Sequence, residues 1–219
     1  MIDPVRIVLN SVALDLLEDR AVFLPNESLL VLADVHLGKA TGFQSSGINI
    51  PEGDNARDLN RIDRLIEKTN CQQVVIAGDF LHTPSGVSKE LIDLVDLWIA
   101  HSGAKILLVA GNHDRRALGK KPDFKLEIVD RFESEALEII HDPKDAGATK
   151  LTICGHVHPA VRINRLKLRS ACFHVSANCV TLPAFGSFTG SQLVRPEPDD
   201  RIFVSTGKRI AEIPVDYVS

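Results

Sequence analysis

Short apolar runs that end abruptly recur along the first two thirds of the chain. Each run holds four or five residues, mostly Val, Ile and Leu, and stops at a glycine or a polar residue. Continuous apolar runs of this length, bounded by turn-forming residues, predict strands that are buried on both faces. The predicted strands are Leu29–Ala33, Val74–Ala77, Ile106–Ala110, Leu137–Ile140 and Leu151–Cys154.

Two of the intervening segments have a helical pattern. In Ala56–Lys68 and in Lys89–Ala100, apolar residues recur every three or four positions, which predicts amphipathic helices. Strands that alternate with helices indicate a sheet with helices packed on its faces. The first two thirds of the chain therefore predict an α/β fold.

The last third of the chain has a different pattern. From Val161 onward the helical spacing fades, and short strand-like pieces predict a second, more antiparallel sheet. Two sheets wrapped by helices are expected to form one layered domain over residues 1–219. The pieces are Leu166–Ser170, Cys172–Val175, Val180–Leu182, Ile202–Ser205 and Ile210–Pro214.

Composition narrows the class of protein. With 44% hydrophobic and 25% charged residues, the chain is expected to fold, and its apolar runs are too short to cross a membrane. The formal charge of −4 argues against a uniformly positive surface that coats nucleic acid. The first residues show no secretory signal, and the four cysteines form no CxxC pair, so we expect reduced thiols and a cytoplasmic location.

Polar, chemistry-bearing side chains follow all five predicted buried strands. In an α/β sheet, binding sites form at the carboxyl ends of the strands, so these side chains are expected to lie close together. Residues two apart in an extended chain point to the same side, which lets Asp34 converge with His36, and His156 with His158. The full set is Asp34, His36, Asp79, Asn112, His141, His156 and His158.

This set of side chains predicts a metal site. Imidazole and carboxylate together suit Mn²⁺, Fe²⁺ or Zn²⁺ better than Ca²⁺. Seven candidate ligands are too many for one ion. Two divalent ions about 3.5–4 Å apart, bridged by one carboxylate, would use them all.

In chain order the five blocks read DxH, GD, GNHD, H and GHxH, a pattern that resembles the calcineurin-like metallophosphoesterases. The resemblance implies a four-layer α/β/β/α sandwich with two mixed sheets. It also implies that His113 sits over the phosphate and that Asp114 orients it. The implied metal ligands are Asp34, His36 and His158 for one ion, Asn112, His141 and His156 for the other, and Asp79 as the bridge.

Longer phrases resemble a narrower family, the bacterial ligase-associated DNA damage response endonucleases, which are related to Mre11-type nucleases. The phrases are ADVHLGK at 33–39, GDFLH at 78–82 and LPAFGSFTG at 182–190. This resemblance implies a role in DNA repair beside an ATP-dependent DNA ligase, a helicase and an exonuclease. The resulting hypothesis is a nuclease that hydrolyses DNA phosphodiester bonds through a metal-bound hydroxide, with Mn²⁺ favoured and Fe²⁺ or Zn²⁺ as alternatives.

Positive side chains near the metal blocks are candidate contacts for DNA. Arg115 and Arg116 follow the GNHD block directly and begin a basic segment that continues to Lys125. A second basic run places Arg165, Lys167 and Arg169 at alternate positions. Either run could neutralise backbone phosphates, and the alternative is a solvated charged face.

Other interpretations stay open at this level. The same metal blocks would serve a phosphoesterase of small nucleotides, such as cyclic nucleotides, which needs no open basic groove. A catalytically dead scaffold for protein partners is a third possibility, although such a chain should have lost ligands and none is missing here. His82, three residues after Asp79, is expected either to support the metal ligands or to contact the substrate.

Overall fold

The computed structural model describes residues 4–39, 54–119, 125–163, 168–206 and 209–218, and its strands form two mixed sheets. In the first sheet the strands follow one another in sequence order. The initial strands pair antiparallel and the last four pair parallel. They are β1 (Val5–Leu9), β2 (Val12–Leu17), β3 (Ala21–Leu24), β4 (Leu29–Leu32), β5 (Gln73–Ile76), β6 (Lys105–Val109) and β7 (Glu127–Val129).

The second sheet is built from the remaining strands. Its centre, β9–β10–β13, is parallel, antiparallel strands extend it on both sides, and the edge strand β14 pairs parallel with β11. The strands are β8 (Phe132–Glu133), β9 (Leu137–Ile139), β10 (Leu151–Cys154), β11 (Pro159–Ile163), β12 (Leu168–Ser176), β13 (Cys179–Thr181), β14 (Gln192–Leu193), β15 (Arg201–Ser205) and β16 (Ile210–Ile213). The two pieces predicted on either side of Ala171 are one strand, β12.

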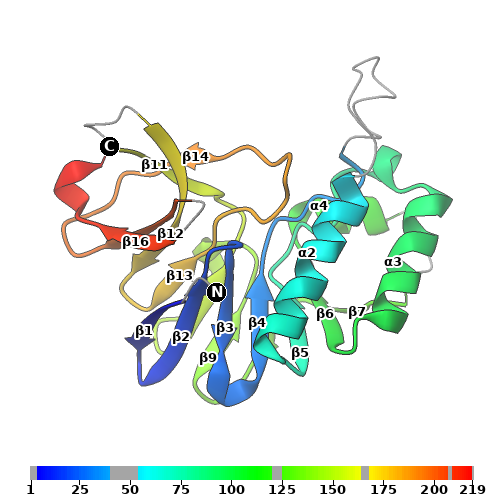
Figure 1. Ribbon diagram of the computed structural model, residues 1–219, viewed down its shortest axis with the longest axis horizontal. Helices are drawn as coiled ribbons and strands as arrows, with labels where there is room; N and C mark the ends of the chain where they lie inside the picture. The colour runs from blue at the N-terminus through cyan, green and yellow to red at the C-terminus, as the bar shows by residue number, and fades with distance from the viewer. Residues whose placement is uncertain (1–3, 40–53, 120–124, 164–167, 207–208, 219) are drawn as a thin grey trace.

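The α-helices among the described residues all lie between β4 and β7 in the chain: α2 (Asp54–Thr69), α3 (Lys89–His101) and α4 (Asn112–Leu118). Figure 1 shows α2 and α3 side by side over the parallel strands of the first sheet. On β9 of the second sheet, Glu138 is buried and accepts a hydrogen bond from the Gly147 N–H (2.6 Å) and one from Thr152 Oγ1 (2.8 Å). A loop therefore covers that part of the second sheet.

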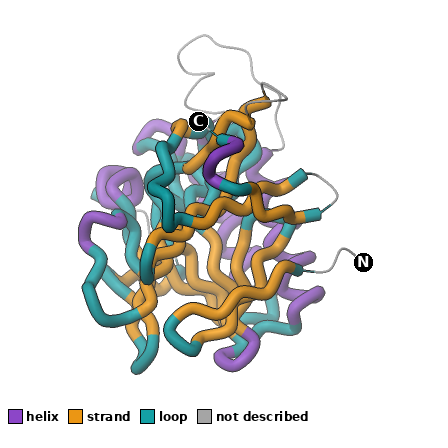
Figure 2. The backbone as a smooth tube through the Cα atoms, turned by 90° about the vertical axis from the view of Figure 1, so that its left-hand side faces the viewer, coloured by secondary structure: helices purple, strands orange, loops and turns teal. Residues whose placement is uncertain are grey.

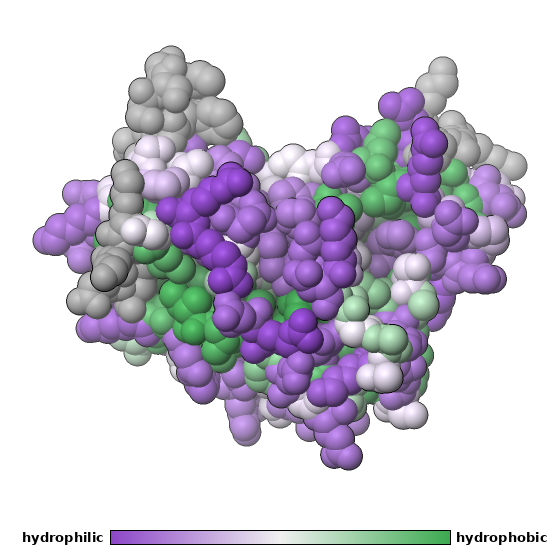
Figure 3. All heavy atoms as spheres, turned by 180° about the vertical axis from the view of Figure 1, so that it is seen from behind, coloured by the Kyte–Doolittle hydropathy of each residue, from purple (hydrophilic) through white to green (hydrophobic). Residues whose placement is uncertain are grey.

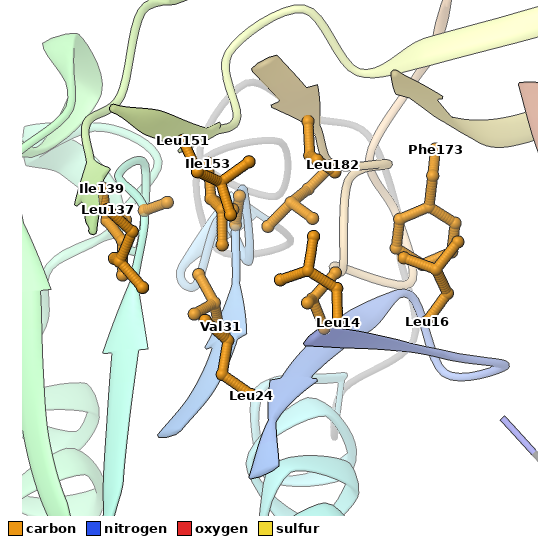
Figure 4. Close-up of a cluster of buried hydrophobic side chains, with 14 of the residues drawn as sticks. Leu14, Leu16, Leu24, Val31, Leu137, Ile139, Leu151, Ile153, Phe173 and Leu182 are labelled. Atoms are coloured by element: carbon orange, nitrogen blue, oxygen red, sulfur yellow. The ribbon is translucent and has the colours of Figure 1, made fainter. Parts of the chain in front are cut away.

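The two sheets pack face to face through a buried apolar layer. Leu14, Leu16 and Val31 of the first sheet point toward Ile153 and Phe173 of the second (Figure 4). Each such buried side chain contributes about 1.5–3 kcal/mol through the hydrophobic effect. In Figure 2 the strands occupy the middle of the molecule and the helices lie toward its outside. This packing fixes the strand ends of both sheets relative to each other.

The surface is mainly polar, in contrast to the apolar layer between the sheets. Hydrophilic side chains cover most of the face shown in Figure 3, with smaller apolar areas between them. All four cysteines are free thiols. No helix in the described parts of the chain is long and apolar enough to span a membrane.

Candidate metal centre

The carboxyl ends of strands from both sheets meet at one edge of the molecule. β4, β5 and β6 lead into Asp34, Asp79 and Asn112. From the second sheet, β9 and β10 lead into His141 and His156. The predicted ligands, scattered over more than a hundred residues of sequence, are thus brought together by the face-to-face packing of the sheets.

The backbone at this edge adopts a conformation that L-residues rarely use. Asp34 (φ 58°), His36 (φ 54°) and Asp79 (φ 50°) are left-handed, as are His156 (φ 69°) and His158 (φ 51°). Such residues cost of order 1–3 kcal/mol each and cluster at functional sites. Hydrogen bonds between the two loops hold the first three in place, including His36 N–H to the Asp79 carbonyl (2.9 Å). The fold stabilises this backbone so that the side chains point inward.

Two glycines allow this close approach. Gly78 has φ 85°, and a Cβ at this position would lie 2.0 Å from His141 Nδ1. A Cβ at Gly155 would lie 2.6 Å from Asp34 Oδ2. A side chain at either glycine would therefore collide with a predicted ligand.

One set of ligand atoms, which we call the first group, consists of Asp34, His36 and His158. Their ligand atoms lie within 4.8 Å of one another. His158 Nε2 is 3.2 Å from Asp34 Oδ1 and 3.4 Å from His36 Nε2. Asp34 is fully buried, and its carboxylate also accepts from the His156 N–H (3.0 Å).

The second group consists of Asp79, His141 and His156, again with ligand atoms within 4.8 Å of one another. His141 Nε2 is 3.1 Å from His156 Nδ1 and 3.1 Å from Asn112 Oδ1, so the amide of Asn112 joins this group. The other nitrogen of His141, Nδ1, lies 3.0 Å from the Ala77 carbonyl. A carbonyl only accepts, so Nδ1 carries a hydrogen, and Nε2 is the nitrogen that faces the group.

Asp79 of the second group also faces the first group. Its Oδ2 is 3.4 Å from His141 Nε2 and 3.9 Å from His36 Nε2, while Oδ1 accepts from the His113 N–H (2.9 Å). One oxygen is fixed by backbone, and the other faces ligands of both groups.

The two histidines nearest Asp79 differ in their proton affinity. Burial lowers the pKa of His36 to about 3. Burial acts in the same direction on His141, but the hydrogen bond and the negative charge of Asp79 outweigh it and raise the pKa of His141 to about 9. In the metal-free protein at neutral pH, a proton on His141 therefore pairs with the charge of Asp79.

The buried carboxylates show that the site fits divalent cations. Burial raises the pKa of Asp34, whereas for Asp79 the hydrogen bond and charge of His141 overcome burial and lower the pKa. An ionised carboxylate is stable in such a buried place only when it is hydrogen-bonded, paired with a positive charge or bound to a metal. The donors that face them, imidazole nitrogens and an amide oxygen, are ligands of Mn²⁺, Fe²⁺ and Zn²⁺.

His113 lies beside the first group, with its ring centroid 5.0 Å from that of His36. Its Nδ1 is 2.5 Å from the carbonyl of His82, and its ring stacks on the His82 ring at 5.1 Å between centroids. The carbonyl makes Nδ1 the protonated nitrogen, which leaves Nε2 for a substrate.

Asp114 contacts the backbone rather than the ring of His113. Its oxygens accept from the Leu81 N–H (2.8 Å) and the Gly111 N–H (2.9 Å). Burial raises the pKa of Asp114 to about 6. The structure thus assigns the direct orientation of the His113 ring to the His82 carbonyl, while Asp114 fixes the start of α4 on the loop that follows β5.

The two candidate arginines lie in different surroundings. Arg115 lines a hollow of about 510 Å³ together with Asn112, His141 and His156, and its guanidinium pairs with the exposed Asp130 (2.8 Å). Arg116 is exposed and is not among the residues that line this hollow. Lys120, Lys121, Arg165 and Lys167 lie outside the described residues.

His82 and Asp142 contact candidate metal ligands, but the sequence alone does not establish a role for either residue. His82 places Nδ1 3.2 Å from His36 Nδ1, in agreement with a role in support of the ligands, and burial lowers its pKa to about 4. Asp142, which the sequence analysis did not identify, faces His156 with 3.6 Å between Oδ2 and Nε2. Its signal is its place directly after His141.

Buried imidazoles and carboxylates gathered at one edge of the sheets suit a metal-dependent hydrolase. Comparison with known proteins shows which family of hydrolases this is. The family model of the calcineurin-like phosphoesterases matches residues 28–171. The chain belongs to this family and is a metal-dependent phosphoesterase. Its α/β fold of two mixed sheets is the one that the sequence resemblance implied.

Solved structures give a more specific likeness. The nuclease MPE of Pseudomonas putida is 33% identical, with a TM-score of 0.81 over 95% of this chain and 100% of that chain. YfcE, a phosphoesterase from E. coli, is 15% identical, with a TM-score of 0.45 over 85% of this chain and 98% of that chain. No curated protein matches the chain in sequence.

Proposed function

We propose that this protein is a nuclease that hydrolyses DNA phosphodiester bonds with two divalent cations, Mn²⁺ first among the candidates. The observation that carries the proposal is that Asp79, a member of the second group, also faces His36 of the first group. The 33% identity to a nuclease over nearly the whole chain supports DNA as the substrate.

The residues have separate tasks in this proposal. Asp34, His36 and His158 would hold one cation, and Asn112, His141 and His156 the other, with Asp79 shared. The bound cations would lower the pKa of a water molecule and neutralise charge on the phosphate. The chain supplies the fixed lone pairs that hold them, such as His141 Nε2, whose ring is anchored by the Ala77 carbonyl.

His113 would act on the substrate. With Nδ1–H donated to the His82 carbonyl, the doubly protonated ring would carry its second proton on Nε2. That proton would go to the oxygen that leaves the phosphorus, or would form a hydrogen bond to the phosphate. Asp114 would act as a positioning residue, because it joins the start of α4 to the loop after β5. Arg115 would contact a backbone phosphate from the rim of the hollow.

Cleavage assays with matched substrates test the proposal. Labelled single-stranded DNA, a cyclic nucleotide and a chromogenic phosphodiester are offered to the EDTA-treated protein before and after Mn²⁺ is added. We expect Mn²⁺ to restore DNA cleavage, His113→Ala to reduce it by about 10²–10⁴-fold, and His101→Ala, an exposed histidine at the end of α3, to leave it unchanged.

Each of the other outcomes would refute the proposal in its own way. Hydrolysis of the cyclic nucleotide alone would indicate an enzyme of small nucleotides. Failure to bind metal, with no hydrolysis of any substrate, would indicate a scaffold.

The resemblance extends the proposal to DNA repair, in association with an ATP-dependent DNA ligase, a helicase and an exonuclease. Purification of the tagged protein from its own cells should recover at least one of these enzymes after DNA damage. Recovery of none of them, from cells in which the tagged protein is active, would contradict the association.

A further inference from the structure

Asp142 lies beside the second group. The proposed function gives this carboxylate no task. It follows His141 directly and precedes the short 3₁₀-helix η3 (Pro143–Asp145). Its Oδ1 accepts from the Lys144 N–H (3.0 Å), which fixes the side chain on its own loop. Its Oδ2 is then turned toward His156, 3.6 Å from Nε2. One oxygen anchors the carboxylate and the other faces an imidazole.

The His156 ring is placed between Asp142 and the second group. Its Nδ1 lies 3.1 Å from His141 Nε2, on the side of the ligands, while its Nε2 faces Asp142. A neutral imidazole carries its hydrogen on one nitrogen and has a lone pair on the other. A carboxylate only accepts, so it favours the form of His156 that has the hydrogen on Nε2 and the lone pair on Nδ1.

We propose that Asp142 is a positioning residue that orients His156 and sets its tautomer, so that Nδ1 is presented to the cation of the second group. The inference rests on the proposed function, because it assumes that His156 is a ligand. It goes beyond that function by assigning a task to a residue outside the ligand set. Outer carboxylates that accept from a ligating histidine raise metal affinity and fix the direction of the ring.

The neighbouring ligand has a backbone acceptor at hydrogen-bond distance. His141 Nδ1 lies 3.0 Å from the Ala77 carbonyl, and its Nε2 faces the group. Both imidazoles of the second group thus have an oxygen on the side away from the other ligands, at hydrogen-bond distance for His141 and at 3.6 Å for His156. For His141 the acceptor is backbone, which no substitution removes. For His156 it is a side chain, so the effect of the acceptor can be measured.

Asp145 provides a matched control. It lines the same hollow as Asp142 and carries the same charge, but its side chain is exposed, and Arg131 Nη2 contacts its backbone carbonyl (3.4 Å). Replacing either residue changes the charge of the hollow equally. Only the change at Asp142 alters the partner of His156.

The experiment is a calorimetric titration of the metal-free protein with Mn²⁺. We expect two ions for the wild type. Asp142→Ala should weaken one of them by about 10–100-fold and leave the other unchanged. Asp142→Asn, which keeps an acceptor oxygen, should recover part of the loss, and Asp145→Ala should match the wild type.

The outcomes separate this inference from the proposed function. A wild type that does not bind two ions would overturn both. A wild type that binds two ions, with an Asp142→Ala variant of equal affinity at both, would overturn the inference alone, as would equal losses in the Asp142 and Asp145 variants.

A second measurement needs no substitution. Nitrogen-15 NMR of the neutral His156 ring in the wild type should show the hydrogen on Nε2, and a hydrogen on Nδ1 would overturn the inference even if the variants failed to fold.

Discussion

The first and second groups draw ligands from the same two sheets, yet they differ in their surroundings. Asp34 and His36 of the first group are buried, and burial lowers the pKa of His36 to about 3. Asn112, His141 and His156 of the second group line a hollow of about 510 Å³. There the charge of Asp79 outweighs burial and raises the pKa of His141 to about 9. His36 of the first group is thus buried and neutral, whereas His141 of the second group lines an open hollow and holds a proton.

Because of this difference, the first and second groups would bind a cation in different ways. His36 has no proton to lose at neutral pH, so its lone pair is ready for a metal. His141 has to release its proton first, and Asp79 then pairs with the metal in place of the imidazolium. The open side is also the side from which a substrate would approach, since the hollow and Arg115 lie there.

The largest expected effect comes from the residue that both groups share. Asp79→Asn keeps the shape of the side chain but removes the charge that faces His36 and His141. We expect both cations to bind more weakly and the rate of phosphodiester hydrolysis to fall by more than about 100-fold. Loss of a residue that only supports a ligand costs up to about 100-fold, and Asp79 is proposed to be a ligand itself. Metal counting and initial rates with a chromogenic phosphodiester measure this.

Asp93→Asn is the control, because this carboxylate is exposed on α3. If the Asp79 variant lost only one ion, or kept most of its rate, Asp79 would serve a single group, and the two groups would not share a ligand.

The pH dependence of metal binding distinguishes the two groups directly. Below its pKa of about 9, His141 is protonated in the metal-free protein, so binding at the second group releases a proton. Its affinity for Mn²⁺ should rise about tenfold per pH unit from pH 7 to 9 and then level off. The affinity of the first group should change little over this range, because His36 is already neutral.

Titrations at pH 7, 8 and 9, each in buffers of different ionisation enthalpy, count the protons released. Equal proton release at both groups would show that His36 and His141 do not differ as described.

A smaller effect is expected at the rim. Arg115 lines the hollow beside the second group, whereas Arg116 does not. Arg115→Ala should lower the affinity for DNA and reduce the slope of log affinity against log salt concentration by about 1. Arg116→Ala is the matched control and should leave the slope unchanged. Equal losses in the two variants, measured by fluorescence anisotropy, would mean that DNA does not enter through this hollow.

The sequence predicts which side chains meet at this edge, because each candidate ligand follows a buried strand. Runs such as Leu29–Leu32 and Leu151–Cys154 are recognisable from their own residues, and the packing of parallel strands brings their ends to one edge. The hairpin of β1 and β2 lies outside the strands that the apolar runs predict. Its signal is the pair Asn10 and Ser11, both left-handed, which form a turn between two apolar runs.

Other features depend on tertiary contacts that a local pattern cannot reveal. Helix α4 has only seven residues, and the buried carboxylate of Asp114 holds its start against the loop after β5. The acceptor for the His113 ring is a backbone carbonyl, which has no sequence signature. The partnership of Asp142 with His156 joins residues from two loops and becomes visible only when both are in place.

Anomalous diffraction from crystals grown with Mn²⁺ tests the central claim most directly. We expect two peaks, one among Asp34, His36 and His158 and one among Asn112, His141 and His156, with Asp79 between them. A single peak, or peaks away from these side chains, would contradict the claim that the two groups hold two cations.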